Sequence, residues 1–503
     1  MLFPTALFAL FFIVVATLHW TLPERSLARK IWLFAASVFF YAWWSWRFAL
    51  MMLASALVNH GFALAIARAR HGGSETAAES PEGVRRAKRL LVLCIVLDLL
   101  LLAVFKYARF LVYDALWPIL VPLCRAMGEG AVDALIAFHE AADPILTGIV
   151  LPIGLSFYTF QAIAYVVDVH RGTVRPAASW LDFANFLAFF PKLTSGPIVR
   201  TADFLPQMET LPSRDTPVDT GRAVTLVIGG LIKKMVVANW LASHLVDPFF
   251  SAPEDFGVWD ALLGSYGYAI QLYCDFSAYS DIATGCALLL GFRFPDNFRA
   301  PYIATSIQDF WRRWHISLSS WLRDYLYIPF GGSRCAPWKV HRNLLLTMLL
   351  GGLWHGASWA FLLWGVFHGL VQCIERLFRK SKKADPVSGI RRIVAIVFTF
   401  HIATFAWILF RCGFADMQGF ETFRAVLGAF GRAAPSALFS AMAVGMLLLG
   451  YALQALDGDT PRRIWNAFNR LPVWARALLA ALLFTLVAGL GPSGVAPFIY
   501  FAF

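Results

Sequence analysis

Residues 351–359 read Gly351-Gly-Leu-Trp-His-Gly-Ala-Ser-Trp359 and lie inside an apolar block that covers residues 343–371. The block is long enough to cross the hydrocarbon core of a bilayer, which takes about 20 apolar residues in a helix. His355 lies near its middle, and the ten residues on either side contain no carboxylate. Because an ionisable group in a membrane segment is costly, this stretch predicts both a membrane fold and a functional centre.

The composition of the whole chain indicates a membrane fold as well. Of its 503 residues, 59% are hydrophobic and 15% are charged, and the mean hydropathy is +0.63. A soluble domain has about 25% charged residues, so this chain lacks the polar surface that a soluble protein needs. The net charge is +12, but the basic residues lie in short loops between apolar segments. We therefore expect the lipid bilayer as a partner and no nucleic acid.

The apolar segments predict an all-α polytopic membrane protein with about ten to twelve membrane helices. The first span covers residues 1–20, and residues 31–67 make two spans with a tight turn at 44–47. Residues 306–342 are too polar to cross lipid alone, and they predict interfacial or re-entrant helices. Further spans are expected to start near residues 90, 144, 224 and 260, and to cover 393–410, 437–453 and 475–491.

The basic loops give the orientation. Residues 68–89 and 376–392 are interpreted as cytoplasmic linkers, together with the basic segments 25–30 and 462–470. Basic loops stay on the cytoplasmic side, which predicts that the amino terminus lies on the opposite, outer side of the membrane.

His355 is the strongest candidate for catalysis. A neutral imidazole in apolar surroundings accepts a proton from a hydroxyl near neutral pH, as a general base must. Glycines at 351, 352 and 356 let a second backbone or a substrate approach closely. The alternative interpretation is a histidine that joins two helices by a hydrogen bond.

His315 is the second candidate. On a continuous helix, Arg312, His315 and Ser319 would share one face, and nearby cations would favour the neutral imidazole. The alternative is an interfacial helix whose arginines meet lipid phosphates.

Asp275 and Asp281 are intramembrane carboxylates in the polar stretch 271–281. They are six residues apart and do not share a helix face, so each is expected to pair with a Tyr, Ser or Arg of another helix. Two such carboxylates are also typical of a proton-coupled transporter, which is the main alternative function. The histidines and cysteines show no metal-ligand spacing, and we expect no metal site.

Several motifs together resemble one family. The chain has Phe105-Lys-Tyr107, Ser195-Gly-Pro-Ile198, Trp311-Arg-Arg-Trp-His315 and Gly351-Gly-Leu-Trp-His-Gly356. Over about residues 1–410 it resembles the membrane-bound O-acyltransferase family, in the bacterial branch of the alginate O-acetyltransferase membrane subunit. The resemblance implies tilted helices around a thinned centre, with a central tunnel. It also implies a single domain over residues 1–503, with its catalytic core in 271–372.

The resemblance also implies roles for single residues. His355 matches the family's active-site histidine, and His315 matches a second polar position of the motif. The expected acyl donor is acetyl-CoA from the cytoplasm, with no bound cofactor. Its phosphates would meet basic residues of segment 306–342. The candidates for phosphate contact are Arg312, Arg313, Arg323 and Lys339, and those for substrate binding or support are Asp275, Tyr279, Ser319 and Trp354.

The resemblance further implies a bacterial inner-membrane protein. A periplasmic SGNH-like acetyltransferase partner would complete the transfer onto a polysaccharide, so the acceptor is reached indirectly. Lys192 stands where alginate-pathway members have His, which leaves the acceptor open among alginate, cellulose, another exopolysaccharide and peptidoglycan. A family member that transfers D-alanine to a cell-wall polymer is the second alternative.

Overall fold

The computed structural model describes residues 3–71, 80–378, 388–414, 419–454, 460–490 and 498–499. Within these ranges the regular structure is helical and contains no β-strand. The all-α fold that the apolar pattern predicts is therefore confirmed.

The helices of the first half are α1 (Ala6–Thr21), α2 (Leu27–Ala42), α3 (Trp46–His71), α4 (Pro81–Leu102), η1 (Ala103–Tyr107), η2 (Phe110–Leu116), α5 (Trp117–Met127), α6 (Glu129–Thr147), α7 (Leu155–Arg171), α8 (Trp180–Ala188), α9 (Phe190–Leu193), α10 (Thr201–Thr210), α11 (Thr220–Leu231), η3 (Ile232–Ala238), α12 (Asn239–Leu241), η4 (Ala242–Val246) and α13 (Asp247–Ser251). Those that follow are η5 (Pro253–Asp255), α14 (Val258–Leu289), η6 (Pro301–Ile303), α15 (Ile307–Trp311), α16 (Ile316–Leu322), η7 (Arg323–Tyr327), α17 (Pro337–His355), α18 (Trp359–Phe378), α19 (Gly389–Cys412), α20 (Gly419–Ala429), α21 (Ala441–Leu453), α22 (Thr460–Arg470) and α23 (Val473–Leu490).

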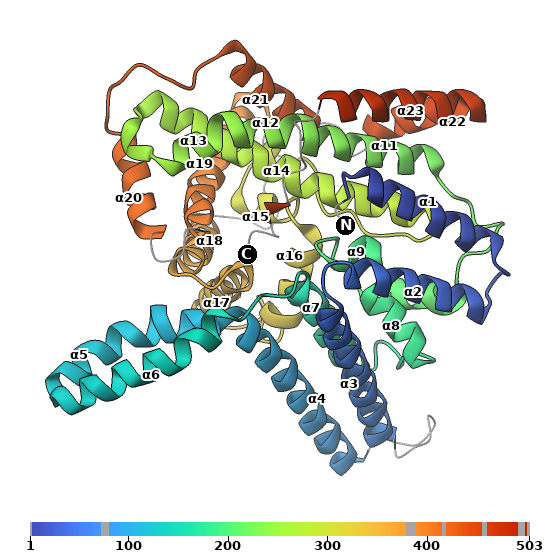
Figure 1. Ribbon diagram of the computed structural model, residues 1–503, viewed down its shortest axis with the longest axis horizontal. Helices are drawn as coiled ribbons and strands as arrows, with labels where there is room; N and C mark the ends of the chain where they lie inside the picture. Colours follow the sequence, from blue (N-terminus) through green and yellow to red (C-terminus); the bar gives the residue numbers. More distant parts are fainter. Residues whose placement is uncertain are drawn as a thin grey trace.

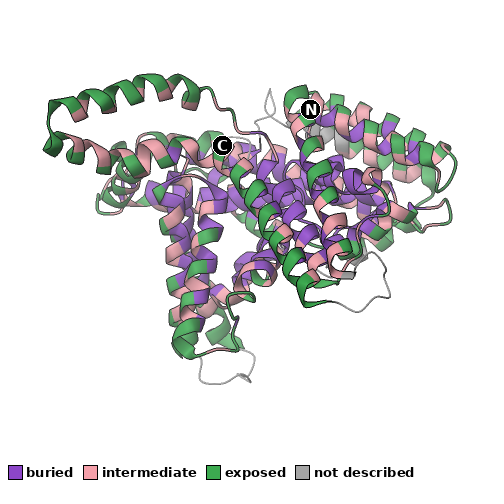
Figure 2. Cartoon of the chain, turned by 90° about the horizontal axis from the view of Figure 1, so that it is seen from below, coloured by how far each residue is buried: buried purple, intermediate pink, exposed green. Residues whose placement is uncertain are grey.

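The helices surround a centre that contains α7, α14, α15 and α16 (Figure 1). Helices α3 and α4 pack side by side and extend away from this centre, and the hairpin of α5 and α6 projects from the body. Helices α17 and α18 pack closely against each other. Buried residues concentrate in the middle of the molecule, as Figure 2 shows. The polar stretch 271–281 lies in this buried region, with residues 272–280 all buried.

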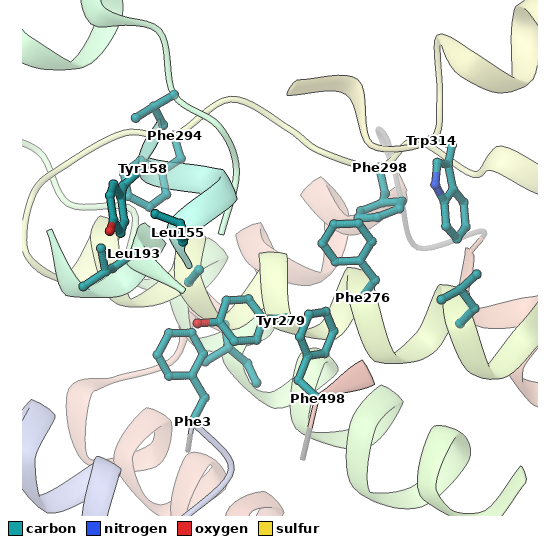
Figure 3. Close-up of a cluster of buried hydrophobic side chains, with 14 of the residues drawn as sticks. Phe3, Leu155, Tyr158, Leu193, Phe276, Tyr279, Phe294, Phe298, Trp314 and Phe498 are labelled. Carbon is teal, nitrogen blue, oxygen red and sulfur yellow. The ribbon is translucent and has the colours of Figure 1, made fainter. Parts of the chain in front are cut away.

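An aromatic cluster fills the centre (Figure 3). Tyr279 of α14 stacks on Phe3 at 4.5 Å between ring centroids and lies 4.9 Å from Phe498. Phe298 and Trp314 meet edge to face at 5.1 Å. Buried aromatic pairs of this geometry add about 0.5–1.5 kcal/mol each beyond their burial. Residues close to both ends of the chain thus take part in the core.

Among the described residues, six helical segments are long and apolar enough to cross a membrane. The expected number of about ten to twelve is higher, because it also counts shorter or more polar helices. Helix α14, for example, has 32 residues but carries Gln271, Asp275 and Ser280. The six spans are Trp46–Arg70, Pro81–Tyr107, Phe110–Met127, Thr220–Ser251, Trp359–Phe378 and Gly389–Cys412, and the shorter apolar helices are Ala6–Thr21, Ala441–Leu453 and Val473–Leu483.

The helix boundaries refine the sequence prediction in two places. The predicted linker 68–89 is shorter, because α3 runs to His71 and α4 starts at Pro81, after a Ser80 hydroxyl that accepts the Gly83 N–H at 3.0 Å. Its middle, residues 72–79, lies outside the described residues, as do residues 379–387 of the second linker.

The span expected from about residue 144 begins at Leu155 instead. Gly154 has a φ of 78°, and a Cβ there would lie 2.6 Å from the Leu193 carbonyl oxygen. This left-handed turn starts α7 in the centre of the protein, directly beside the end of α9.

Candidate active site

His355 is the last residue of α17, and it is 3% exposed. Gly356 is extended, with a φ of −169°, so the helix ends at the imidazole. Three aromatic rings enclose it: Trp354 and Trp364 at 5.0 Å and Phe410 at 5.1 Å between ring centroids. The apolar surroundings that the sequence predicts for this histidine are therefore present.

Glycines bring α17 and α18 together at this point. A Cβ on Gly352 would lie 2.3 Å from the Phe361 carbonyl oxygen and 3.2 Å from the Gly365 Cα. A Cβ on Gly356 would lie 2.1 Å from the Phe361 ring. The close backbone approach expected from the glycines is confirmed at Gly352, whereas Gly356 faces a side-chain ring and Gly351 faces the Leu322 side chain.

His315 does not lie within a continuous helix, and the predicted shared face of Arg312, His315 and Ser319 is wrong. Helix α15 ends at Trp311, and α16 starts at Ile316. Between them His315 adopts a left-handed conformation, with a φ of 43°. The break has a tertiary cause, because the Ile316 N–H donates to the Asn297 carbonyl at 2.9 Å and the Arg299 N–H donates to the Arg313 carbonyl at 2.9 Å.

The hydrogen bonds around His315 define its tautomer. Asn297 donates its Nδ2 to Ser280 at 2.9 Å, so its Oδ1 is the acceptor that faces His315. The Ser317 hydroxyl also donates to this oxygen, at 2.9 Å. His315 Nδ1, at 3.2 Å from the same oxygen, is therefore the protonated nitrogen. Its Nε2 carries a lone pair, is buried, and has no hydrogen-bond partner among the described residues.

Trp354 contacts both candidate histidines. Its ring lies 6.1 Å from His315 and 5.0 Å from His355. Phe157 and Phe160 of α7 pack on its other sides at 5.2 and 5.3 Å. The structure therefore brings His315, Trp354 and His355 into one cluster.

His355 lines one cavity, and a second cavity begins at the next residue. A chamber of about 40 Å³ is lined by His355, Trp354, Lys106, Ser156 and Thr194. A larger outer pocket, of about 660 Å³, starts at Gly356 and opens along the base of the α5–α6 hairpin. Its remaining polar lining consists of Lys106, Arg109, Tyr113, Asp114, His139, Asp143 and Thr147.

A third cavity, of about 780 Å³, lies on the His315 side and is called here the arginine cavity. Ser317, which shares Asn297 with His315, is part of its wall. Arg171, Arg200 and Arg323 line it together with the carboxylates of Asp168, Asp203, Asp296 and Asp324.

Asp324 organises the arginines of this cavity. It accepts from Arg200 at 2.5 Å and from Arg323 at 2.6 Å. Burial opposes the ionisation of Asp324, but the Arg323 hydrogen bond and the charges of both arginines outweigh it and hold the Asp324 pKa below its usual range. The guanidiniums of Arg171 and Arg200 lie over the Tyr325 ring, at 5.2 and 5.0 Å from its centroid.

The other predicted phosphate contacts lie elsewhere. Arg312 is exposed, and Arg313 pairs with Asp309 at 3.0 Å. Lys339 is exposed beside the Trp338 ring. Of the four predicted cations, Arg323 alone is among the described residues that line the arginine cavity. Ser319 donates to the Trp314 carbonyl at 3.3 Å.

The two intramembrane carboxylates pair with lysines. Asp275 lies 2.6 Å from Lys234, and Asp281 lies 2.9 Å from Lys233. We expected each carboxylate to pair with a Tyr, Ser or Arg of another helix; the partners do come from another element, but they are lysines. The sequence feature that could have indicated these partners is Lys233-Lys234, two adjacent cations inside the apolar run that starts near residue 224. Tyr279 bonds the hydroxyl of Thr194, which lines the 40 Å³ chamber.

The fold is that of an all-α membrane protein with a buried histidine cluster, and comparison with known proteins gives its class as acyltransferase. Residues 175–415 match the profile of MBOAT, the membrane-bound O-acyltransferase family. The chain is 37% identical to the "probable alginate O-acetylase AlgI" of Pseudomonas aeruginosa, over 99% of this chain and 88% of the relative. It is 32% identical to the peptidoglycan O-acetyltransferase of Helicobacter pylori, over 82% and 77%. The teichoic acid D-alanyltransferase of Bacillus subtilis is 28% identical, over 51% and 68%.

The chain therefore belongs to the membrane-bound O-acyltransferase family. This membership favours an enzyme over the proton-coupled transporter that the two intramembrane carboxylates left open.

Proposed function

We propose that the protein takes an acetyl group from acetyl-CoA on the cytoplasmic side and passes it across the inner membrane for O-acetylation of an extracellular or periplasmic polysaccharide. The observation that carries this proposal is the position of His355. It is buried at a helix end and shares the Trp354 ring with His315. The outer pocket starts at the next residue, Gly356, and Ser317, close to His315, lines the arginine cavity.

The arginine cavity supports the donor assignment. Arg171, Arg200 and Arg323 line it, and a guanidinium can bond two phosphate oxygens at once. Arg200 and Arg323 are held by Asp324, so a phosphate would have to share them with this carboxylate. At about 780 Å³, the cavity has room for a large part of a coenzyme A molecule. The expectation that basic loops stay on the cytoplasmic side supports a cytoplasmic donor and an amino terminus in the periplasm.

The outer pocket supports the acceptor side. It opens beside the α5–α6 hairpin, whose helices contain no buried residues. A periplasmic SGNH-like acetyltransferase would receive the acetyl group here and transfer it to the polysaccharide. The alginate and peptidoglycan relatives favour an alginate-like exopolysaccharide or peptidoglycan as the acceptor.

The proposed chemistry uses His355 as a general base. The imidazole removes the proton of the acceptor hydroxyl as its oxygen attacks the thioester carbonyl carbon. The carbon–sulfur bond then breaks, and the coenzyme A thiolate takes the proton from the imidazolium, so an acetyl ester and a free thiol leave. His315 Nε2 carries a buried lone pair in the same cluster, and it accepts a hydrogen bond from the substrate or orients the substrate.

The test is acetyl transfer in membrane vesicles from producing cells, supplied with radiolabelled acetyl-CoA. His355→Ala should reduce labelled O-acetyl by at least about 10³-fold with normal amounts of inserted protein. His244→Ala, which removes an exposed histidine, should leave transfer unchanged. Retained acetylation in His355→Ala would contradict the proposal. Transfer of D-alanine but not acetyl by the native protein would favour the D-alanyl branch.

A further inference from the structure

The carboxyl end of α17 presents backbone carbonyls that the helix itself cannot satisfy. A helix leaves its last four carbonyls without intrahelical partners. The Gly356 N–H bonds the Gly352 carbonyl at 3.4 Å. The carbonyls of Leu353, Trp354 and His355 remain, and they belong to the turn that carries the candidate base.

Two adjacent residues of a distant segment bond all three carbonyls. The Tyr107 hydroxyl donates to the Leu353 carbonyl at 2.7 Å. The Lys106 ammonium donates to the Trp354 carbonyl and, at 3.2 Å, to the His355 carbonyl. Both residues end the π-helical turn η1, a wide type of turn that is frequent at functional sites.

Lys106 also joins this helix end to its surroundings. Its ammonium lies 3.3 Å from the Ser156 hydroxyl, in the first turn of α7, and 5.7 Å from the centre of the Trp354 ring. It lines both the 40 Å³ chamber and the outer pocket. A cation at the carboxyl end of a helix also interacts favourably with the helix dipole.

We propose that Lys106 and Tyr107 are positioning residues, which fix the His355 imidazole by holding the last three carbonyls of α17. This inference rests on the proposed function of His355, and it assigns Lys106 and Tyr107 no contact with the reacting atoms. A displacement of about 1 Å at a reacting group costs up to about 100-fold in rate.

Lys106→Met keeps the apolar stem and removes the donors. We expect its kcat for acetyl transfer to fall at least about tenfold, with the KM for acetyl-CoA changed less than about twofold, because the arginine cavity is untouched. Lys106→Arg keeps donors at this site and should recover most of kcat, and Tyr107→Phe should lie between. Lys88→Met removes an exposed lysine of α4 and should match the native protein.

A second measurement does not depend on the acyl donor. Hydrogen–deuterium exchange of the peptide over residues 350–358 should be at least about tenfold faster in Lys106→Met than in Lys88→Met, because the last turn of α17 frays. Unchanged exchange, or an unchanged kcat in an active protein, would overturn the inference. If Lys106→Met does not fold, Tyr107→Phe decides by the same two measurements. Failure of the native protein to use acetyl-CoA would contradict the proposed function instead, and the exchange result would still decide this inference.

Discussion

His315 Nδ1 lies 3.2 Å from Asn297 Oδ1 in the buried centre of the protein, and this contact orients the His315 lone pair at Nε2. The same Asn297 oxygen accepts a hydrogen bond from the Ser317 hydroxyl, and Ser317 lines the arginine cavity. Asn297 therefore connects the wall of the proposed donor cavity to the histidine cluster.

Replacing Asn297 tests this arrangement. Asn297→Ala should lower kcat about tenfold or more, because it leaves buried polar groups without partners, at a cost of about 1–3 kcal/mol, and frees the His315 ring. Asn297→Asp should shift the pH dependence of kcat, because a carboxylate favours the imidazolium form of His315. Asn469→Ala, at an exposed asparagine, is the control. A native pH profile in Asn297→Asp would contradict the assigned role.

The donor assignment predicts that Arg323→Gln raises the KM for acetyl-CoA about five- to tenfold with little change in kcat. Arg312→Gln should have a smaller effect, because Arg312 is exposed outside the arginine cavity. Initial rates over a range of acetyl-CoA concentrations measure both effects. A larger effect of Arg312→Gln would support the sequence-based assignment of the phosphate contacts.

The buried ion pair of Lys234 and Asp275 should be strongly coupled. Lys234→Met or Asp275→Asn alone should lower the free energy of unfolding by about 3–5 kcal/mol, because each leaves a buried group without its partner. The double variant should lose less than the sum, as unfolding in detergent by denaturant titration will measure. The exposed pair Arg299–Asp296 is the control and should contribute at most about 1 kcal/mol. Additive losses for the buried pair would refute the coupling.

Gly352→Ala should separate α17 from α18, because its Cβ would lie 2.3 Å from the Phe361 carbonyl oxygen. We expect a loss of about 1–3 kcal/mol in the free energy of unfolding, together with reduced acetyl transfer. Gly229→Ala is the matched control on α11, since a Cβ there meets nothing within 4 Å. It should leave stability unchanged or raise it by up to about 1 kcal/mol. Equal unfolding midpoints for the two variants would contradict the proposed close packing.

Asp324 predicts a pH dependence of stability. The pKa of Asp324 is lower in the folded state than in the unfolded state. Its ionised carboxylate therefore stabilises the folded protein fully above the unfolded-state pKa of about 4, and this stabilisation is lost as the pH falls through the folded-state pKa. The thermal midpoint of the native protein should therefore exceed that of Asp324→Asn at pH 7, and the difference should shrink below about pH 4. Midpoints in detergent at both pH values measure it. A difference that grows on acidification would contradict this assignment.

Much of the fold could be predicted from local sequence patterns. Long apolar runs predict α1, α3 and α4, and the turn expected at 44–47 corresponds to residues 43–45. The glycines beside His355 predict a close helix contact, which the structure shows at Phe361. These features depend on neighbouring residues alone, because hydrophobicity and helical spacing are properties of a short segment.

The site depends on residues that are distant in sequence, and there the prediction was incomplete. The helix break at His315 follows from hydrogen bonds to residues 297–299. The lysine partners of Asp275 and Asp281 come from a separate helix, 48 residues away in the case of Asp281. The arginine cavity gathers α7, the start of α10, α16 and η7, so Arg171 and Arg200 line it and Arg312 does not.

By itself, the sequence determined that this is an all-α membrane protein with His355 in an apolar block and no carboxylate within ten residues of it, because the free energy of entering lipid is set residue by residue. The tertiary structure decided which groups surround that histidine. Lys106 bonds the carbonyl of His355 across 249 positions of the chain. A buried donor or carbonyl must find a partner wherever helix packing provides one, and that partner is fixed only when the helices are assembled.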